Sequence, residues 1–175
     1  SDLEIYRQSV YESYVLNRMP QWEATLRQME RAYASTPDPA LLYDILLAQY
    51  GLIGFYLGTG QNSKGQNMLE RAEINLSILE TIPAYKTTSL VFGSAFLAFR
   101  ISLRPIRAVQ LGPRSYRLLD QALASDPGYA RVWIEKGNAA FFTPVVFGGN
   151  KQEAISHYRK AIELLEKNMP MNFRW

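Results

Sequence analysis

Five arginines and no acidic residue fall within residues 100–117, so this segment offers the side chains with the clearest chemistry. They are Arg100, Arg104, Arg107, Arg114 and Arg117. A guanidinium group presents a planar fork of N–H donors that matches a carboxylate or a phosphate group. The segment therefore indicates a site for a small anionic ligand or an acidic peptide. The alternative is a basic face that only water contacts.

Charge is divided unevenly along the chain. Residues 1–83 hold six Lys or Arg and ten Asp or Glu, a net charge of −4, whereas residues 84–175 hold thirteen and six, a net charge of +7. The whole chain carries only +3, which is less than the broad basic surface that nucleic acid binding requires. Nucleic acid is therefore the weaker alternative for the arginine-rich segment.

The residue types argue against catalysis, a cofactor and a metal site. The chain has no cysteine, which excludes thiolate ligands, and its single histidine is His157. Arg159 and Lys160 do not favour a general base beside them, so we expect a surface histidine. The glycine-rich stretch at Lys64 lacks the spacing of a phosphate loop, because Lys64 precedes Gly65 instead of following it. We expect no enzyme activity.

Length and composition are those of one globular domain or two small ones. The chain has 175 residues, of which 47% are hydrophobic and 20% are charged. No uninterrupted apolar run approaches about 18 residues, so no membrane span is expected. The chain opens Ser-Asp-Leu-Glu-Ile-Tyr, without the basic and apolar regions of a targeting segment. A cytosolic protein and an exported protein that has lost its leader both fit this opening.

The elements that position these side chains are predicted to be helices, because apolar residues recur at intervals of three and four. One spacing occurs four times: a small residue, a large apolar residue four positions later, and an alanine three after that. The segments are Thr25–Met29–Ala32, Gly65–Leu69–Ala72, Ser115–Leu119–Ala122 and Ala154–Tyr158–Ala161, closed by Pro37, Pro83, Pro127 and Pro170. Such positions share one helix face, so each segment predicts a helix whose small residues admit a close neighbour.

A second helix is expected before each of these, which predicts an all-α protein of eight helices in four antiparallel hairpins. The additional helices are expected at about 2–17, 40–57, 84–103 and 129–142, and the hairpins at about 2–35, 38–82, 84–125 and 128–168. Pro20 and Pro113 are predicted in the first turn of a helix, where a missing N–H costs nothing. Asn150 with Glu153 predicts the start of the last helix.

The last of these repeats carries a family resemblance through Trp133, Gly137, Ala154, Tyr158, Ala161 and Pro170. The pattern resembles the tetratricopeptide repeat (TPR) family, and the extended turn 144–150 is similar to one in some bacterial TPR-like proteins. The resemblance covers nearly the whole chain. It implies a single domain over residues 1–175, a right-handed superhelical stack of the four hairpins (an α-solenoid). Lys136 and Leu47 depart from the family pattern.

The resemblance also implies a concave groove, lined by the first helix of each hairpin, that binds a peptide. The family's groove positions fall on Arg131, Ile134, Asn138 and Phe141, on Thr87, Leu90, Ser94 and Leu97, and on Asp44, Ala48 and Gly51. Asn138 and Arg131 suit a peptide carboxylate, whereas Ile134 stands where a lysine is expected. The leading hypothesis is a non-enzymatic scaffold that binds another protein. The alternatives are an assembly subunit, and a binder of a small anion or nucleic acid through residues 100–117.

Two further features concern turns and ends. Val145-Val146-Phe147 is unusually apolar for a connection, and we expect it to fold back on the neighbouring hairpin; the alternative is an exposed recognition patch. Trp175 comes five residues after Pro170, almost where the aromatic residue of a further repeat would stand. We therefore expect that a further hairpin follows, or that a second copy of the chain covers this end as a homodimer.

Overall fold

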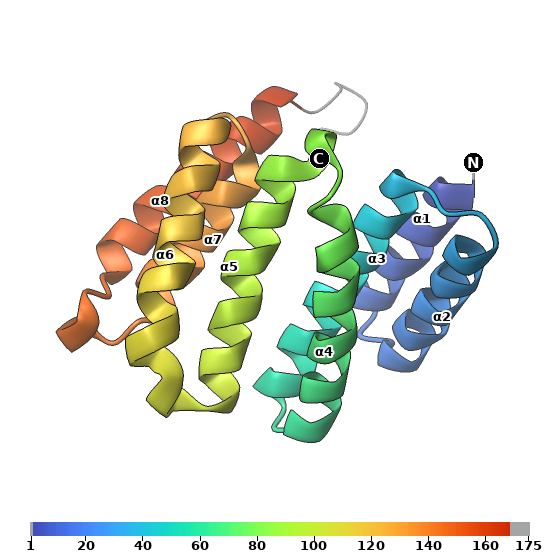
Figure 1. The fold of residues 1–175 in the computed structure, drawn as a ribbon, viewed down its shortest axis with the longest axis horizontal. Helices are drawn as coiled ribbons and strands as arrows, with labels where there is room; N and C mark the ends of the chain where they lie inside the picture. The colour runs from blue at the N-terminus through green and yellow to red at the C-terminus, as the bar shows by residue number, and fades with distance from the viewer. Residues whose placement is uncertain (1, 169–175) are drawn as a thin grey trace. The chain divides into compact units, whose positions relative to one another are not determined.

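The structure is a computed structural model that describes residues 2–168. Over these residues it consists of eight α-helices joined by turns and short 3-10 helices, and it has no strand. The predicted all-α class is confirmed. The chain divides into two compact units, Ser1–Tyr85 (unit 1) and Lys86–Trp175 (unit 2), whose helices are labelled in Figure 1. The predictions about Pro170 and Trp175 lie outside the described residues.

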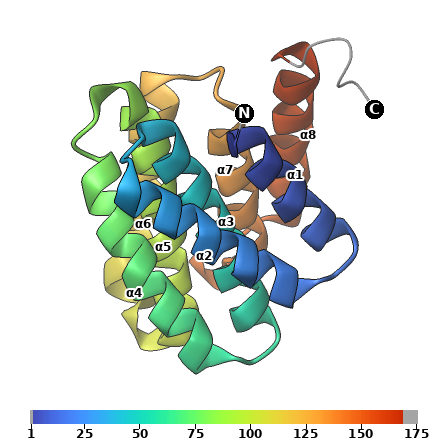
Figure 2. The same cartoon turned by 90° about the vertical axis from the view of Figure 1, so that its right-hand side faces the viewer.

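Unit 1 is built around one long apolar helix. Its helices are α1 (Asp2–Val15), α2 (Met19–Ser35), α3 (Pro39–Gly58) and α4 (Asn62–Leu79), followed by a 3-10 turn at Pro83–Tyr85. Figure 2 shows α1 and α2 running in opposite directions, and α3 packs against both α2 and α4. Leu42, Leu46, Leu52 and Ile53 of α3 are at most 1% exposed. Asp38 starts this helix, because its Oδ1 accepts the backbone N–H of Ala40 at 3.0 Å.

By length and composition alone, α3 meets the criteria for a membrane span, and no other helix in the described part of the chain does. More than half of its most apolar window, 56%, is nevertheless buried inside the protein. Two polar side chains on it, Asp44 and Gln49, are buried as well. Gln49 accepts a hydrogen bond from Asn75 of α4 at 3.0 Å. Burial of this kind is typical of a core helix, and α3 is the core helix of unit 1.

Unit 2 contains two pairs of packed helices. They are α5 (Lys86–Leu103) with α6 (Ala108–Ser125), and α7 (Ala130–Phe142) with α8 (Lys151–Asn168); α5 also packs against α7. Val91, Ala122 and Val132 form a buried cluster against which Leu90 and Tyr129 pack. Three of the four alanines of the repeated spacing are buried: Ala122 is 0% and Ala161 2% exposed, and Ala72 in unit 1 is 0% exposed, whereas Ala32 is half-buried. The predicted burial of Ala72, Ala122 and Ala161 is confirmed.

The structure confirms two of the three predicted helix starts and contradicts the third. Pro20 lies in the first turn of α2, and the Asn150 Oδ1 accepts the N–H groups of Gln152 and Glu153 at 2.9 and 3.2 Å, as predicted. The prediction for Pro113 is wrong, because α6 begins at Ala108 and Pro113 lies inside it. The 3-10 turn Pro105–Arg107 already reverses the chain, so the following helix starts earlier than Pro113 suggests.

Candidate functional site

The apolar turn between α7 and α8 does not fold back, and that prediction is wrong. Val145, Val146 and Phe147 are 81%, 84% and 72% exposed, and Phe142 at the end of α7 is 75% exposed. Four large apolar side chains within six residues therefore face solvent. The alternative interpretation, an exposed recognition patch, fits the structure.

The backbone of this turn holds the apolar side chains outward. Gly149 is buried, and a Cβ atom there would lie 1.7 Å from the Thr143 carbonyl oxygen, so only glycine fits. Its N–H donates to the Pro144 carbonyl at 3.1 Å, and the Asn150 N–H donates to the Ala140 carbonyl at 2.9 Å. Gly148 adopts φ +94°, a left-handed conformation that glycine accepts without strain. The turn is closed on itself by its backbone, so its exposed face is preorganised.

Side chains of α6 and α8 support the same turn. The hydroxyl groups of Tyr116 in α6 and Thr143 are 3.1 Å apart, which links α6 to the beginning of the turn. Phe141 and Phe142 meet edge to face with ring centroids 5.0 Å apart. The Lys151 ammonium lies 5.5 Å from the centroid of the Phe141 ring, a cation–π contact at the start of α8.

The predicted anion-binding arginines lie in the last turn of α5, in the α5–α6 turn and in α6. Arg104, Arg107, Arg114 and Arg117 are exposed, and none forms an ion pair with a described residue, whereas Arg100 is half-buried and does interact within the protein. Ile106 and Val109 between them are each 81% exposed. These arginines therefore remain available to an external anion.

Figures 1 and 2 both place the α5–α6 turn and the α7–α8 turn at the same end of unit 2. We call the residues of these two turns and of the adjoining ends of α6, α7 and α8, taken together, the apolar–basic end. Its members are Arg104, Ile106, Arg107, Val109, Arg114, Arg117, Phe142, Val145, Val146, Phe147 and Lys151. It combines apolar side chains with uncompensated cations, which is suited to a ligand that is itself apolar and negatively charged.

Three of the predicted groove residues, Asp44, Ala48 and Ser94, are buried and inaccessible to a partner; Ala48 is 2% exposed. Asp44 is 5% exposed, and its carboxylate accepts a hydrogen bond from the Arg7 Nε at 2.9 Å. Ser94 is 2% exposed, and its hydroxyl lies 2.7 Å from that of Ser115. Gly51 faces the Trp22 ring, which a Cβ atom at this position would meet at 2.5 Å. Long first helices bury these positions against their own unit.

The remaining groove candidates lie in unit 2. Thr87 pairs with Ser125 through hydroxyl groups 2.7 Å apart, and Leu90 packs on the core cluster. In α7, Arg131, Ile134 and Asn138 are half-buried, and Phe141 is 44% exposed. The Asn138 Oδ1 accepts a hydrogen bond from the Tyr158 hydroxyl at 2.7 Å, so this amide also holds α8 against α7.

His157 is a packing residue, and the prediction of a surface position is wrong. Its side chain is 15% exposed and its ring centroid lies 5.7 Å from that of Trp133. Its Nε2 is 3.4 Å from a carboxylate oxygen of Glu153, which stands one helical turn earlier. Among residues 2–168, no group of three or more His, Cys, Asp or Glu side chains is placed to hold a metal ion.

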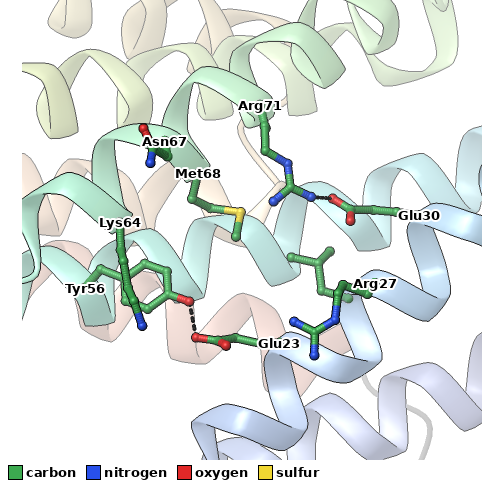
Figure 3. Close-up of a pocket in the computed structure, with 9 residues that line it drawn as sticks. Glu23, Arg27, Glu30, Tyr56, Lys64, Asn67, Met68 and Arg71 are labelled. Carbon is green, nitrogen blue, oxygen red and sulfur yellow. Dashed lines mark hydrogen bonds and ion pairs between the residues drawn. The ribbon is translucent and has the colours of Figure 1, made fainter.

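Unit 1 contains a pocket that the sequence did not predict. Side chains of α2, α3 and α4 enclose about 240 Å³ there, with Tyr56 and Met68 among the lining residues (Figure 3). The helix-period pattern marks Tyr56 and Met68 only as apolar positions. The glycine-rich stretch at Lys64, which lacks the spacing of a phosphate loop, gives no sign in the sequence that Lys64 also borders a cavity.

Comparison with known proteins identifies the fold and not a family. No protein-family model matches the chain, and no curated protein matches it. Among solved structures, the chain is similar to the HusA haemophore from Porphyromonas gingivalis, with a TM-score of 0.76 and 21% identity. The alignment covers 96% of this chain and 82% of that one. At this identity the likeness supports the all-helical fold alone.

Proposed function

We propose that this protein is a non-enzymatic binding protein whose ligand is an apolar molecule with carboxylate groups, held at the apolar–basic end of unit 2. The exposed turn at Val145, Val146 and Phe147 carries this proposal. Contiguous exposed apolar surface beyond a few hundred Å² generally marks an interaction site. Because the turn is closed by its own backbone hydrogen bonds, binding does not have to order it first.

Haem is the first ligand to test, because the structural neighbour is a haemophore. A tetrapyrrole of this kind has a flat apolar body and two carboxylates. Rings and aliphatic side chains of the turn suit the body, and guanidinium forks suit the carboxylates. The single histidine packs on Trp133, and the Tyr116 hydroxyl next to the turn pairs with the hydroxyl of Thr143. We therefore propose that contact with the macrocycle and its carboxylates, and not iron ligation, supplies the affinity.

Titration with haemin and with metal-free protoporphyrin IX tests this proposal. Absorbance and fluorescence changes should give similar dissociation constants for both, because iron is not required. The triple variant Val145→Ser, Val146→Ser and Phe147→Ser should bind at least about tenfold more weakly, a loss of about 1.4 kcal/mol. A matched control replaces exposed apolar residues of unit 1, Ile74→Ser with Ile78→Ser, and should bind as the unmodified protein does.

Charge is tested separately. The variant Arg104→Gln, Arg107→Gln and Arg114→Gln should weaken porphyrin binding and reduce its dependence on salt, because screening acts on exposed charge pairs. Absence of porphyrin binding at micromolar protein, or equal binding by the turn variant, would overturn the proposed function.

A second candidate is a scaffold that binds a segment of another protein in a TPR-like groove. It is favoured by Phe141, which stays 44% exposed on α7, the helix that also carries the half-buried Arg131. It requires that the four hairpins stack as one right-handed superhelix over residues 1–175. Within unit 1 α1 packs on α2 and α3 on α4, and within unit 2 α5 packs on α6 and α7 on α8, which are the hairpins that such a stack would use. Residual dipolar couplings measured across both units would test the stack. Phe141→Ala should then weaken capture of a defined peptide ligand.

Self-association is the structural alternative that the exposed turn also allows. Sedimentation velocity distinguishes self-association from a ligand site when the unmodified protein is compared with the turn variant, in which Val145, Val146 and Phe147 are replaced by serine. If the unmodified protein is a dimer and the turn variant is a monomer, the exposed turn binds a second copy of the chain. A monomer in both cases supports a ligand site.

A further inference from the structure

The pocket in unit 1 lies between α2, α3 and α4, and its floor is apolar. It encloses about 240 Å³ and is lined by Glu23, Leu26, Arg27, Glu30, Tyr56, Lys64, Asn67, Met68 and Arg71 (Figure 3). Leu26, Met68 and Tyr56 are 1%, 8% and 4% exposed. These side chains expose little of their own surface, so most of the apolar area that leaves water on binding belongs to the ligand. Such burial is favourable in proportion to the apolar area covered.

Both carboxylates of the pocket already have partners within the protein. The Tyr56 hydroxyl donates a hydrogen bond to the Glu23 carboxylate, and the Arg71 guanidinium forms an ion pair with Glu30. Burial of Tyr56, together with the adjacent Glu23 carboxylate, raises the pKa of the phenol well above its usual range, so the phenol stays neutral. The ion pair compensates the charge of Glu30, whereas Glu23 keeps its charge beside the neutral phenol and is counted in the net charge of the lining.

Two cations of the pocket have no carboxylate partner among the described residues. Arg27 and Lys64 are both exposed at the rim, and Figure 3 shows them on either side of Glu23. The Lys64 ammonium lies 5.7 Å from the centroid of the Tyr56 ring, which holds it over the opening. With three cations and two carboxylates, the lining carries a net charge of +1. The pocket therefore attracts an anion and repels an amine.

We infer that this pocket binds a small carboxylate with a flat apolar body, the class of aryl-alkanoic acids. The carboxylate pairs with Arg27 and Lys64, and the ring rests on Leu26, Met68 and Tyr56. Pockets for drug-sized molecules enclose about 300–1,000 Å³, so this smaller volume suits a ligand with one ring and a short acidic arm. The site lies in unit 1 and is independent of the function proposed for unit 2.

The experiment uses 3-phenylpropionate as the probe and the full chain labelled with ¹⁵N. Two-dimensional amide spectra at low salt should show saturable shifts confined to residues of α2, α3 and α4 around the pocket. The neutral amide 3-phenylpropanamide and the cation phenethylamine should each bind at least about tenfold more weakly. Added salt should weaken binding of the acid, because its partners are exposed cations.

Variants locate the site. Arg27→Gln and Lys64→Gln should each raise the dissociation constant about fivefold or more, whereas Arg18→Gln, which removes an exposed arginine of the α1–α2 turn, should leave it unchanged. All three side chains are exposed, so the variants retain the fold, which the dispersion of the same spectra verifies. No saturable shift with the acid, equal binding of the amide, or unchanged binding by both pocket variants overturns the inference. None of these outcomes bears on porphyrin binding by unit 2.

Discussion

The ring of Tyr158 in α8 occupies the space that a side chain at Gly137 in α7 would need. A Cβ atom at Gly137 would lie 2.5 Å from the Tyr158 Cε1, closer than packed carbon atoms approach. The neighbouring Asn138 accepts a hydrogen bond from the hydroxyl of the same tyrosine at 2.7 Å. Two consecutive residues of α7 therefore hold one side chain of α8, through close packing and through a hydrogen bond.

Gly137→Ala should destabilise the protein by about 1–3 kcal/mol, because overpacking outweighs the better helix propensity of alanine. Urea unfolding measures the change. The matched control is Gly54→Ala in α3, where no atom lies within 4 Å of the added Cβ. This control should gain up to about 1 kcal/mol from helix propensity. Stabilisation by both substitutions would contradict the packing described for Tyr158.

Ala122→Leu should also destabilise by overpacking, by about 1–3 kcal/mol. Ala122 is fully buried in the cluster with Val91 and Val132, so a larger side chain displaces both neighbours. Ala124→Leu, two residues further along α6 and exposed, should change the free energy of unfolding by less than about 0.5 kcal/mol. Thermal unfolding of the two variants compares them directly, and equal midpoints would contradict the helix register.

Stability should fall at alkaline pH, in part through Tyr56. The folded protein holds the pKa of this phenol above its ordinary value, chiefly through burial and then through Glu23. Above pH of about 10 the unfolded chain therefore loses this proton while the folded protein keeps it, and the free energy of unfolding decreases. Below that pH the contribution is fully present. Tyr56→Phe should reduce the decrease seen in urea unfolding between pH of about 9.5 and 11.5, and an identical slope in both proteins would refute this assignment.

Gly149→Ala should weaken porphyrin binding although it alters none of the exposed apolar side chains. The added Cβ atom would collide with the Thr143 carbonyl, so the backbone that presents Val145, Val146 and Phe147 has to shift. Gly148→Ala provides the comparison, since it is strained by its positive φ but has open space around it. We expect the larger loss of affinity from Gly149→Ala. Unchanged affinity in that variant would mean that the shape of the turn does not matter for the ligand.

Local patterns in the sequence were sufficient to predict the helices and their contacts. The spacing of three and four that includes Ala72, Ala122 and Ala161 places those alanines on one helix face, and the structure buries all three. The cap at Asn150 was predictable for the same reason, because a capping side chain bonds to N–H groups only two and three residues away. The excess of positive charge in residues 84–175 is a property of composition and needs no structure.

Contacts between residues far apart in the chain decided the sites. Asp44 is buried because Arg7, 37 positions earlier, supplies its partner, and the pocket exists because α2, α3 and α4 bring Arg27, Tyr56 and Lys64 together. The apolar turn remains exposed because Gly149 packs on its own backbone, leaving Phe147 and its neighbours outside. Periodicity shows which residues share a helix face, but exposure depends on what packs against that face, and only the tertiary structure determines that.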